Sequence, residues 1–391
     1  MKILLIGNGF DLAHDLPTRY SNFLDFVNEY IWHSKSGDGI QHEEYCLYFD
    51  SLLEQYPVVY KEYGDLIDGN RLLKYFLGIY SDRCENGKDG WIDFENEIAI
   101  IVKNLESAQE QFIEQSEEGN EVIAFRPRSV DMIVQTLLLV GEDGKGYGHN
   151  IPDSFKDGRV DGILNDLNRL TRLLEMYLVE YVETREVRKR LPEFENSSID
   201  RVISFNYTDT YRKLYDKNGN AEYCFIHGKA RGNADVYSCD LVLGINEEQR
   251  YNSQLFNNSF VWFKKFYQRI YKETDSEYVD WMEAYEQALQ AMPKSKIPGN
   301  DLYIYGHSLD VTDKDVLESL ILAPKMTTHI YYYCKKDLSD KIRNLVAIIG
   351  QLELIKRTRG KRRSIIFTKS GVSDSLQEGD DKDSEVERLL R

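Results

Sequence analysis

Residues able to do chemistry gather at four places in this sequence, each directly after an apolar run that predicts a β-strand. The runs and the residues that follow them are 3–6 with Gly7, Asn8, Gly9 and Asp11; 201–205 with Asn206 and Asp209; 223–226 with His227; and 302–305 with Gly306, His307 and Ser308. Because an open parallel sheet binds ligands at the carboxyl ends of its strands, we expect these segments to line one cleft.

The first segment has the residue types of a phosphate-binding turn. Glycines at positions 7 and 9 let the backbone turn tightly and leave its N–H groups uncovered, so that a phosphate can sit against the start of a helix. The segment continues through Pro17 and Arg19. It predicts a nucleotide site, although many α/β turns need two glycines for steric reasons alone.

The elements that must position these segments are short strands separated by long helical stretches. The remaining runs with strand character are 240–243, 329–333 and 364–368. We predict an α/β fold, a Rossmann-like and mostly parallel sheet with a large helical insertion between the first and second strands. The predicted units are a nucleotide-binding core at 1–19 and 200–369, a helical insertion at 20–199 and an acidic, mobile tail at 370–391.

Composition limits the partners. The chain has 391 residues and a formal net charge of -17, which repels nucleic acid and anionic membranes. One basic run, at 356–363, reverses the charge locally, and the acidic tail close by is expected to neutralise it.

The cysteines and the hydropathy indicate the compartment. Five scattered cysteines without a C-x-x-C pair argue against a zinc ribbon and a disulfide framework, and for a reducing compartment. The histidines lack the spacing of metal ligands, so we predict no metal. No apolar run approaches the roughly 18 residues that a membrane-spanning helix needs. We expect a cytoplasmic protein with no membrane association.

The blocks at the strand ends resemble two protein families. Together, G-N-G-F-D-L-A-H-D-L-P-T-R-Y, S-F-N-Y-T-D, I-H-G and Y-G-H-S-L-D resemble the bacteriophage abortive-infection AbiH family, over residues 1 to about 335. More distantly, the same blocks are similar to the sirtuin (SIR2-like) NAD-binding proteins. Their G-A-G-x-S-x-x-x-G-I-P-x-F-R has glycines and proline at the spacing of Gly7, Gly9 and Pro17, and their T-Q-N-x-D, H-G and G-T-S-L-x-V follow in the same order.

The resemblance implies an antiphage protein that binds NAD as substrate or ligand. The dinucleotide would cross Gly7, Asn8 and Gly9, with Gly306 and Ser308 near its phosphates or adenosine ribose. Asn206 and Asp209 would face the nicotinamide ribose, and His227 would be the general base. An amide can stabilise the oxocarbenium character of the breaking bond, and an imidazole can take a proton at neutral pH. A phage-derived trigger is also implied, as is a second copy or a defence-system partner at the helical insertion.

The sequence departs from the sirtuin pattern at three points, and the last of them favours simple NAD cleavage over deacylation. Asp11 replaces a serine, Asp209 comes one residue late, and the four-cysteine zinc site is missing. Purely structural roles also fit these residues. Asn206 could cap a helix beginning near Tyr207, His227 could be a turn histidine, and Asp11 could cap the first helix.

Other functions remain open at this point. A non-catalytic nucleotide sensor that signals through the helical insertion fits the same residues. A metal-dependent nuclease could use Asp93 and Glu97, which share one helical face, although an exposed acidic face is the commoner outcome. Gly306-His307-Ser308-Leu309-Asp310 partly matches a serine-hydrolase elbow with His329 downstream, but Asp310 replaces its final glycine.

Overall fold

The computed structural model describes residues 1–35, 42–85, 92–117, 137, 159–195, 197–232, 234–245, 258–291, 299–361 and 363–371. Most of the tail predicted at 370–391 therefore lies outside the described residues, as do parts of the predicted helical insertion.

Six parallel strands among the described residues form one sheet with the order β3-β2-β1-β4-β5-β6. The strands are β1 (Lys2–Ile6), β2 (Arg201–Ser204), β3 (Glu222–Phe225), β4 (Asn300–Tyr305), β5 (Met326–Tyr332) and β6 (Ile365–Lys369). The strand order reverses between β1 and β4, which are direct neighbours. This all-parallel sheet confirms the predicted Rossmann-like α/β fold, and it places a topological switch point at the end of β1.

Helices cover both faces of the sheet because alternate residues of each strand point to opposite sides. One face carries Ile3, Leu5 and Ile304, and it packs against α13 (Glu277–Ala291), α14 (Lys314–Leu322), α15 (Lys335–Ile349) and α16 (Gln351–Thr358). The other face carries Leu4, Ile6 and Val202, and it packs against α1 (Asn8–Ala13), α10 (Pro192–Glu195) and α11 (Thr210–Tyr215).

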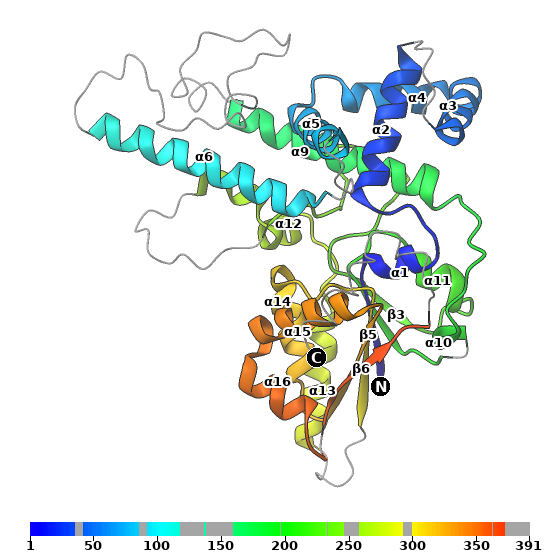
Figure 1. Cartoon of the computed structure of the whole chain (residues 1–391), viewed down its shortest axis with the longest axis vertical. Helices are drawn as coiled ribbons and strands as arrows, with labels where there is room; N and C mark the ends of the chain where they lie inside the picture. The colour runs from blue at the N-terminus through cyan, green and yellow to red at the C-terminus, as the bar shows by residue number, and fades with distance from the viewer. Residues whose placement is uncertain are drawn as a thin grey trace, which may run out of the picture.

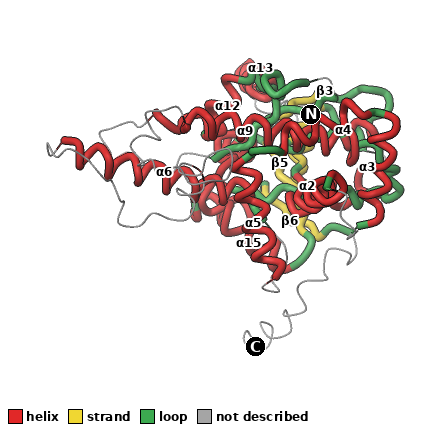
Figure 2. The backbone as a smooth tube through the Cα atoms, turned by 90° about the horizontal axis from the view of Figure 1, so that it is seen from above, coloured by secondary structure: helices red, strands yellow, loops and turns green. Residues whose placement is uncertain are grey.

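A helical body lies over the carboxyl edge of the sheet (Figures 1 and 2). It consists of α2 (Tyr20–Ser34), α3 (Glu43–Gln55), α4 (Pro57–Ile67), α5 (Arg71–Glu85), α6 (Phe94–Glu117), α9 (Arg159–Met176) and the π-helix η2 (Tyr177–Val182). Its core is rich in aromatic rings, and Phe94 stacks between Tyr20 and Phe76. The apolar period expected over 161–190 forms a helix only as far as Val182.

The helical body is not built from the insertion alone. Cys239, Leu241 and Leu243, which follow β3, belong to its hydrophobic cluster, as do Phe260 and Phe263. The last two lie on the 3₁₀-helix η3 (Asn258–Phe263), which leads into α12 (Lys265–Tyr271). The segment after β3 therefore joins the sheet to the helical body.

The strand predicted at 240–243 is wrong. This segment is buried, but its backbone pairs with a loop and a side chain instead of a strand. The N–H of Val242 donates to the carbonyl of His227 at 2.9 Å. The carboxamide of Gln268 accepts from the N–H of Leu243 at 2.9 Å and donates to its carbonyl at 2.8 Å. A glutamine on α12 thus takes the place of a neighbouring strand.

No helix among the described residues has both the length and the apolar character needed to cross a bilayer.

His14 ties α1 to α11 and makes the fold sensitive to acid. Its Nδ1 lies 2.7 Å from the carbonyl oxygen of Phe10, and its Nε2 lies 2.7 Å from the hydroxyl of Tyr215. Burial lowers the pKa of His14 to about 4, below the ordinary value of 6.5. Since the unfolded chain takes up a proton first, His14 adds stability above pH 6.5 that is lost as the pH falls toward 4.

We therefore expect the difference in free energy of unfolding between wild type and His14→Gln to be smaller in acid than at neutral pH. The variant loses hydrogen bonds and should be less stable at neutral pH, but the gap should shrink by roughly 2 kcal/mol in mildly acidic buffer. Denaturant unfolding of both proteins at the two pH values measures this difference. An equal gap at both values would show that His14 has the same pKa in the folded and the unfolded chain.

Candidate functional site

The four strand ends lie side by side. β3, β2, β1 and β4 are consecutive neighbours, and Ile226 N–H still donates to the carbonyl of Ser204 at 3.0 Å beyond the paired residues. Asn206 and His227 each lie two residues past the last paired positions of adjacent strands. The structure thus brings the residues after β1, β2, β3 and β4 to one edge, beneath the helical body.

The paired glycines are needed for close packing between the β1–α1 turn and the turn after β4. A Cβ at Gly7 would lie 2.7 Å from the Cα of His307, and one at Gly9 would lie 2.7 Å from the Cα of Gly306. The N–H of Gly9 donates to the carbonyl of Gly306 at 2.8 Å, and that of Gly7 donates to the carbonyl of Tyr305 at 3.1 Å. Both amides therefore have backbone partners.

Two histidines flank one buried aspartate at this edge. Asp313 ends the 3₁₀-helix η4 (Val311–Asp313), and its Oδ2 lies 3.4 Å from Nε2 of His307. His307 Nδ1 accepts the N–H of Leu309 at 2.9 Å, which leaves its proton on Nε2, facing Asp313. Nε2 of His227 lies 3.3 Å from the other oxygen, close enough for an ion pair but not directed as a hydrogen bond.

Burial and charge set the protonation states of this group. Burial and the nearby Lys265 lower the pKa of His227 to about 4, although Asp313 opposes them, so the imidazole is neutral at pH 7. Burial alone would raise the pKa of Asp313, but Lys265 and the two histidines outweigh it and hold that pKa well below its usual range. The aspartate is therefore ionised beside a neutral imidazole, an arrangement that stabilises an imidazolium once a proton is taken up.

Lys265 connects this group to the helical body. Its side chain is 3 % exposed, and its Nζ lies 3.3 Å from Asp313 Oδ1 and 2.7 Å from Oε2 of Glu95 on α6. Burial raises the pKa of Glu95 to about 7, with Lys265 opposing the rise. One ammonium group thus holds two carboxylates, one from each part of the molecule.

Asn206 is buried without a partner for its carboxamide. Its backbone is fixed by the hydroxyl of Ser204, which accepts from Asn206 N–H at 3.1 Å and donates to its carbonyl at 3.0 Å. Within the described part of the chain, neither Nδ2 nor Oδ1 has a hydrogen bond, although the residue is 5 % exposed. The helix after β2 begins at Thr210 with Asp209 at its N-cap, so the expectation that Asn206 caps a helix near Tyr207 is wrong.

Asp11 also points a free oxygen into this region. It lies inside α1 and does not cap it; its Oδ2 accepts from Thr208 at 2.5 Å, and Thr208 in turn accepts from Thr210 at 3.1 Å. Among the described residues, its Oδ1 has no hydrogen-bond partner in good geometry. Burial raises the pKa of Asp11 to about 6, and the hydroxyl groups of Thr208 and Thr210 and the nearby carboxamide of Asn206 oppose the rise. Asp11 and Asp313 are therefore two carboxylates whose pKa values are pushed apart, a feature of acid–base sites.

The family model for bacteriophage abortive infection AbiH matches residues 3–333. The chain belongs to the AbiH family. No curated protein matches the chain. The match covers β1 to β5, and so it includes every residue of the edge described above. Membership supports a role in antiphage abortive infection.

The remaining predicted site residues of this AbiH protein lie around the edge. Asn8 bonds back to the chain beyond α1, donating from Nδ2 to the carbonyl of Thr18 at 3.2 Å. The carbonyl of Pro17 accepts from Tyr177 at 2.7 Å, which fastens the turn to the helical body. Arg19 and Ser308 are exposed. Arg19 and Ser308 could thus meet a ligand only from the solvent side.

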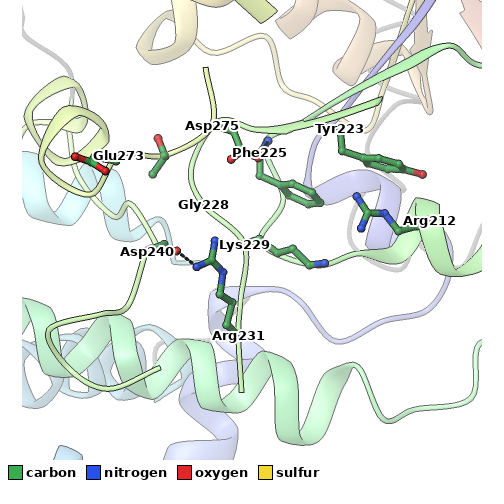
Figure 3. Close-up of a pocket in the computed structure, with 10 residues that line it drawn as sticks. Arg212, Tyr223, Phe225, Gly228, Lys229, Arg231, Asp240, Glu273 and Asp275 are labelled. Carbon is green, nitrogen blue, oxygen red and sulfur yellow. Dashed lines mark hydrogen bonds and ion pairs between the residues drawn. The ribbon is translucent and has the colours of Figure 1, made fainter. Parts of the chain in front are cut away.

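Asp209 faces a different space from His227. Its Oδ2 lies 2.6 Å from Nζ of Lys229, and its Oδ1 lies 3.6 Å from Nε of Arg212. Lys229 and Arg212 line a cavity of about 190 Å³ beside the edge strand β3, with Phe225 between them (Figure 3). Asp209 therefore pairs with two cations that line this cavity, and it does not itself line the cavity.

The residues considered for a nuclease and for a serine hydrolase make other contacts in the structure. Asp93 Oδ1 accepts the N–H groups of Glu95 and Asn96 at the start of α6, while Glu97 pairs with Arg83 at 2.5 Å. His329 stacks on Tyr303 and lies 3.3 Å from Asp301, within the sheet and not at its edge. Within the described ranges, no group of three or more His, Cys, Asp or Glu residues is placed to hold a metal ion.

Three residues of the edge had no predicted role. Asp313 follows Gly306, His307 and Ser308 closely in sequence. The only local indication of its role is that it is an acid in the turn after a strand. Lys265 and Glu95 are far apart in the sequence and meet only because α12 and the start of α6 come together. Nothing in their local patterns indicates that contact.

Proposed function

We propose that this AbiH protein binds NAD at the carboxyl edge of the sheet and hydrolyses its nicotinamide–ribose bond. The observation that carries the proposal is the carboxamide of Asn206, which is buried with both polar atoms unsatisfied. Leaving such a group unpaired costs about 1–3 kcal/mol, and the cost is removed when a ligand supplies the partners.

The unpaired atoms fit the hydroxyl groups of a ribose. Asn206 offers its NH₂ group as donor and its carbonyl oxygen as acceptor, and Asp11 offers one carboxylate oxygen as acceptor. A ribose diol presents two hydroxyl groups, each able to donate and to accept. Asn206 and His227 each lie two residues past a paired position of adjacent parallel strands, so a sugar held by Asn206 would lie at the same sheet edge as His227. Phe205, the residue before Asn206, contacts both imidazole rings, with centroids 5.3 Å from His227 and 4.4 Å from His307.

The same residues suit the bond-breaking step. Water attacks the anomeric carbon while the glycosidic electron pair moves onto the positively charged pyridinium nitrogen, so nicotinamide leaves as a neutral molecule and needs no general acid. The proton of the attacking water goes to His227, and Asp313 stabilises the imidazolium. The products are nicotinamide and ADP-ribose.

Replacing Asn206 by alanine should weaken NAD binding by about tenfold or more, since a buried hydrogen-bonding pair contributes about 1–3 kcal/mol. Calorimetry with a folded Asn206→Ala protein measures the affinity. Chromatography of the same mixtures separates the two nucleotide functions, because nicotinamide release identifies an enzyme and bound intact NAD identifies a sensor. Unchanged affinity in the variant would remove Asn206 from the binding site.

A further inference from the structure

The helical body contributes a charge to the group of residues around Asp313. Among the described residues, Glu95, at the start of α6, reaches this group through Lys265, whose Nζ lies 2.7 Å from Glu95 and 3.3 Å from Asp313. Lys265 and His227 both approach the same oxygen of Asp313, Oδ1. The ammonium and the imidazole therefore compete for one carboxylate oxygen.

We propose that Glu95 is a positioning residue which holds Lys265 and sets the net charge around Asp313, so that His227 can accept a proton. This inference rests on the proposed function, because the proton is the one released by water in NAD cleavage. It makes a residue of the helical body part of the site's acid–base chemistry.

Counting charges gives the physical reason. Above pH 7, where Glu95 and Asp313 are both ionised and Lys265 is protonated, this buried group has one net negative charge, and a proton on His227 makes it neutral. Without the Glu95 charge, Lys265 and Asp313 neutralise each other, and a proton on His227 leaves a buried net positive charge. Burying an uncompensated charge is costly, so the imidazole becomes a poorer base.

Other groups that face these residues do not replace Glu95. The surroundings include a second cation near His227, a second carboxylate near Glu95 and two tyrosines, namely Arg269, Asp93, Tyr20 and Tyr207. Arg269 pairs with Asp315 at 2.8 Å, and Asp93 accepts backbone N–H groups at the start of α6. Neither contacts Asp313, so the charge on Glu95 remains the one that balances Lys265.

A double-mutant cycle separates this role from a structural one. Glu95→Gln should lower nicotinamide release by about tenfold or more at unchanged NAD affinity. Lys265→Met added to Glu95→Gln removes both charges, restores one net negative charge on Asp313, and should bring the rate back to within about threefold of wild type. Two structural losses would instead add, and a double variant at least as slow as Glu95→Gln would overturn the inference.

Two control variants and a second readout complete the test, and the second readout does not depend on activity. Glu318→Gln makes the same change at a half-exposed pair on α14 and should have no effect. Glu95→Asp keeps the charge and should retain most of the rate, with folding checked by circular dichroism. Nuclear magnetic resonance titration of His227 should give a midpoint below wild type in Glu95→Gln and at or above it in the double variant. Equal midpoints would overturn the inference, whereas absence of NAD cleavage in wild type would overturn only the proposed function.

Discussion

Replacing His227 by alanine should lower nicotinamide release by ~10²-fold or more, with circular dichroism unchanged. His227 is 5 % exposed, neutral at pH 7 and 3.3 Å from an ionised aspartate, so it can accept a proton from water and its imidazolium is stabilised by Asp313. Removing the imidazole removes the proton acceptor, while the Asn206 amide and the Asp11 carboxylate remain. NAD affinity should therefore change much less than the rate.

The matched control is His42→Ala, the same substitution at an exposed histidine before α3, and it should leave the rate unchanged. His227→Ala combined with Asn206→Ala should fall little below the slower single variant, because both residues act on one transition state. A folded His227→Ala protein with the wild-type rate would remove His227 from the chemistry.

The largest effect on stability is expected at Gly306. Its φ is +69°, and a Cβ there would lie 2.1 Å from the backbone nitrogen of Phe10 and 2.4 Å from the carbonyl carbon of Gly9. Both obstacles are backbone atoms and cannot rotate away. Gly306→Ala should therefore lower the free energy of unfolding by about 3 kcal/mol or more, through overpacking and a strained backbone.

Gly299→Ala, at the other end of β4, is the matched control. No atom of the described residues lies within 4 Å of a Cβ at Gly299, and its φ is not in the left-handed region, so this variant should be as stable as wild type. Denaturant unfolding of both variants measures the difference. Equal stabilities would show that the turn after β4 is not packed against the β1–α1 turn as described.

The same contacts explain why the glycine spacing predicts a tight turn but not the reason that the turn needs two glycines. The G-N-G block correctly placed a tight turn after β1 at the sheet's carboxyl edge. A one-dimensional pattern could not show that Gly9 faces Gly306, or that its N–H already has a carbonyl partner. The close approach of two turns is a tertiary requirement that looks identical to a phosphate-binding requirement in the sequence.

Strands were easier to predict than the contacts between them. Runs such as 3–6 and 302–305 are short, apolar and bounded by turn residues, so the local pattern is sufficient. The segment 240–243 has the same pattern, but its hydrogen bonds go to His227 and to the side chain of Gln268. The run is apolar because it is buried, and the local pattern does not show whether a neighbouring strand is present to pair with it.

The acidic stretch at the start of α6 shows why site residues are harder to predict from the sequence than strands. Helical spacing singled out Asp93 and Glu97, which share one face, but Asp93 caps the helix and Glu97 pairs with Arg83. The residue between them, Glu95, reaches Lys265 instead. Which carboxylate faces the sheet depends on how α6 meets α12, and that is decided by packing between segments far apart in the sequence.

The most direct test of NAD cleavage is the NAD content of phage-infected cells that carry either the wild-type protein or His227→Ala at equal protein levels. Infection supplies any phage-derived trigger that a purified protein would lack. We expect NAD to fall in the wild-type cells and to be retained in the His227→Ala cells. Equal NAD levels in the two strains would contradict NAD hydrolysis by this site.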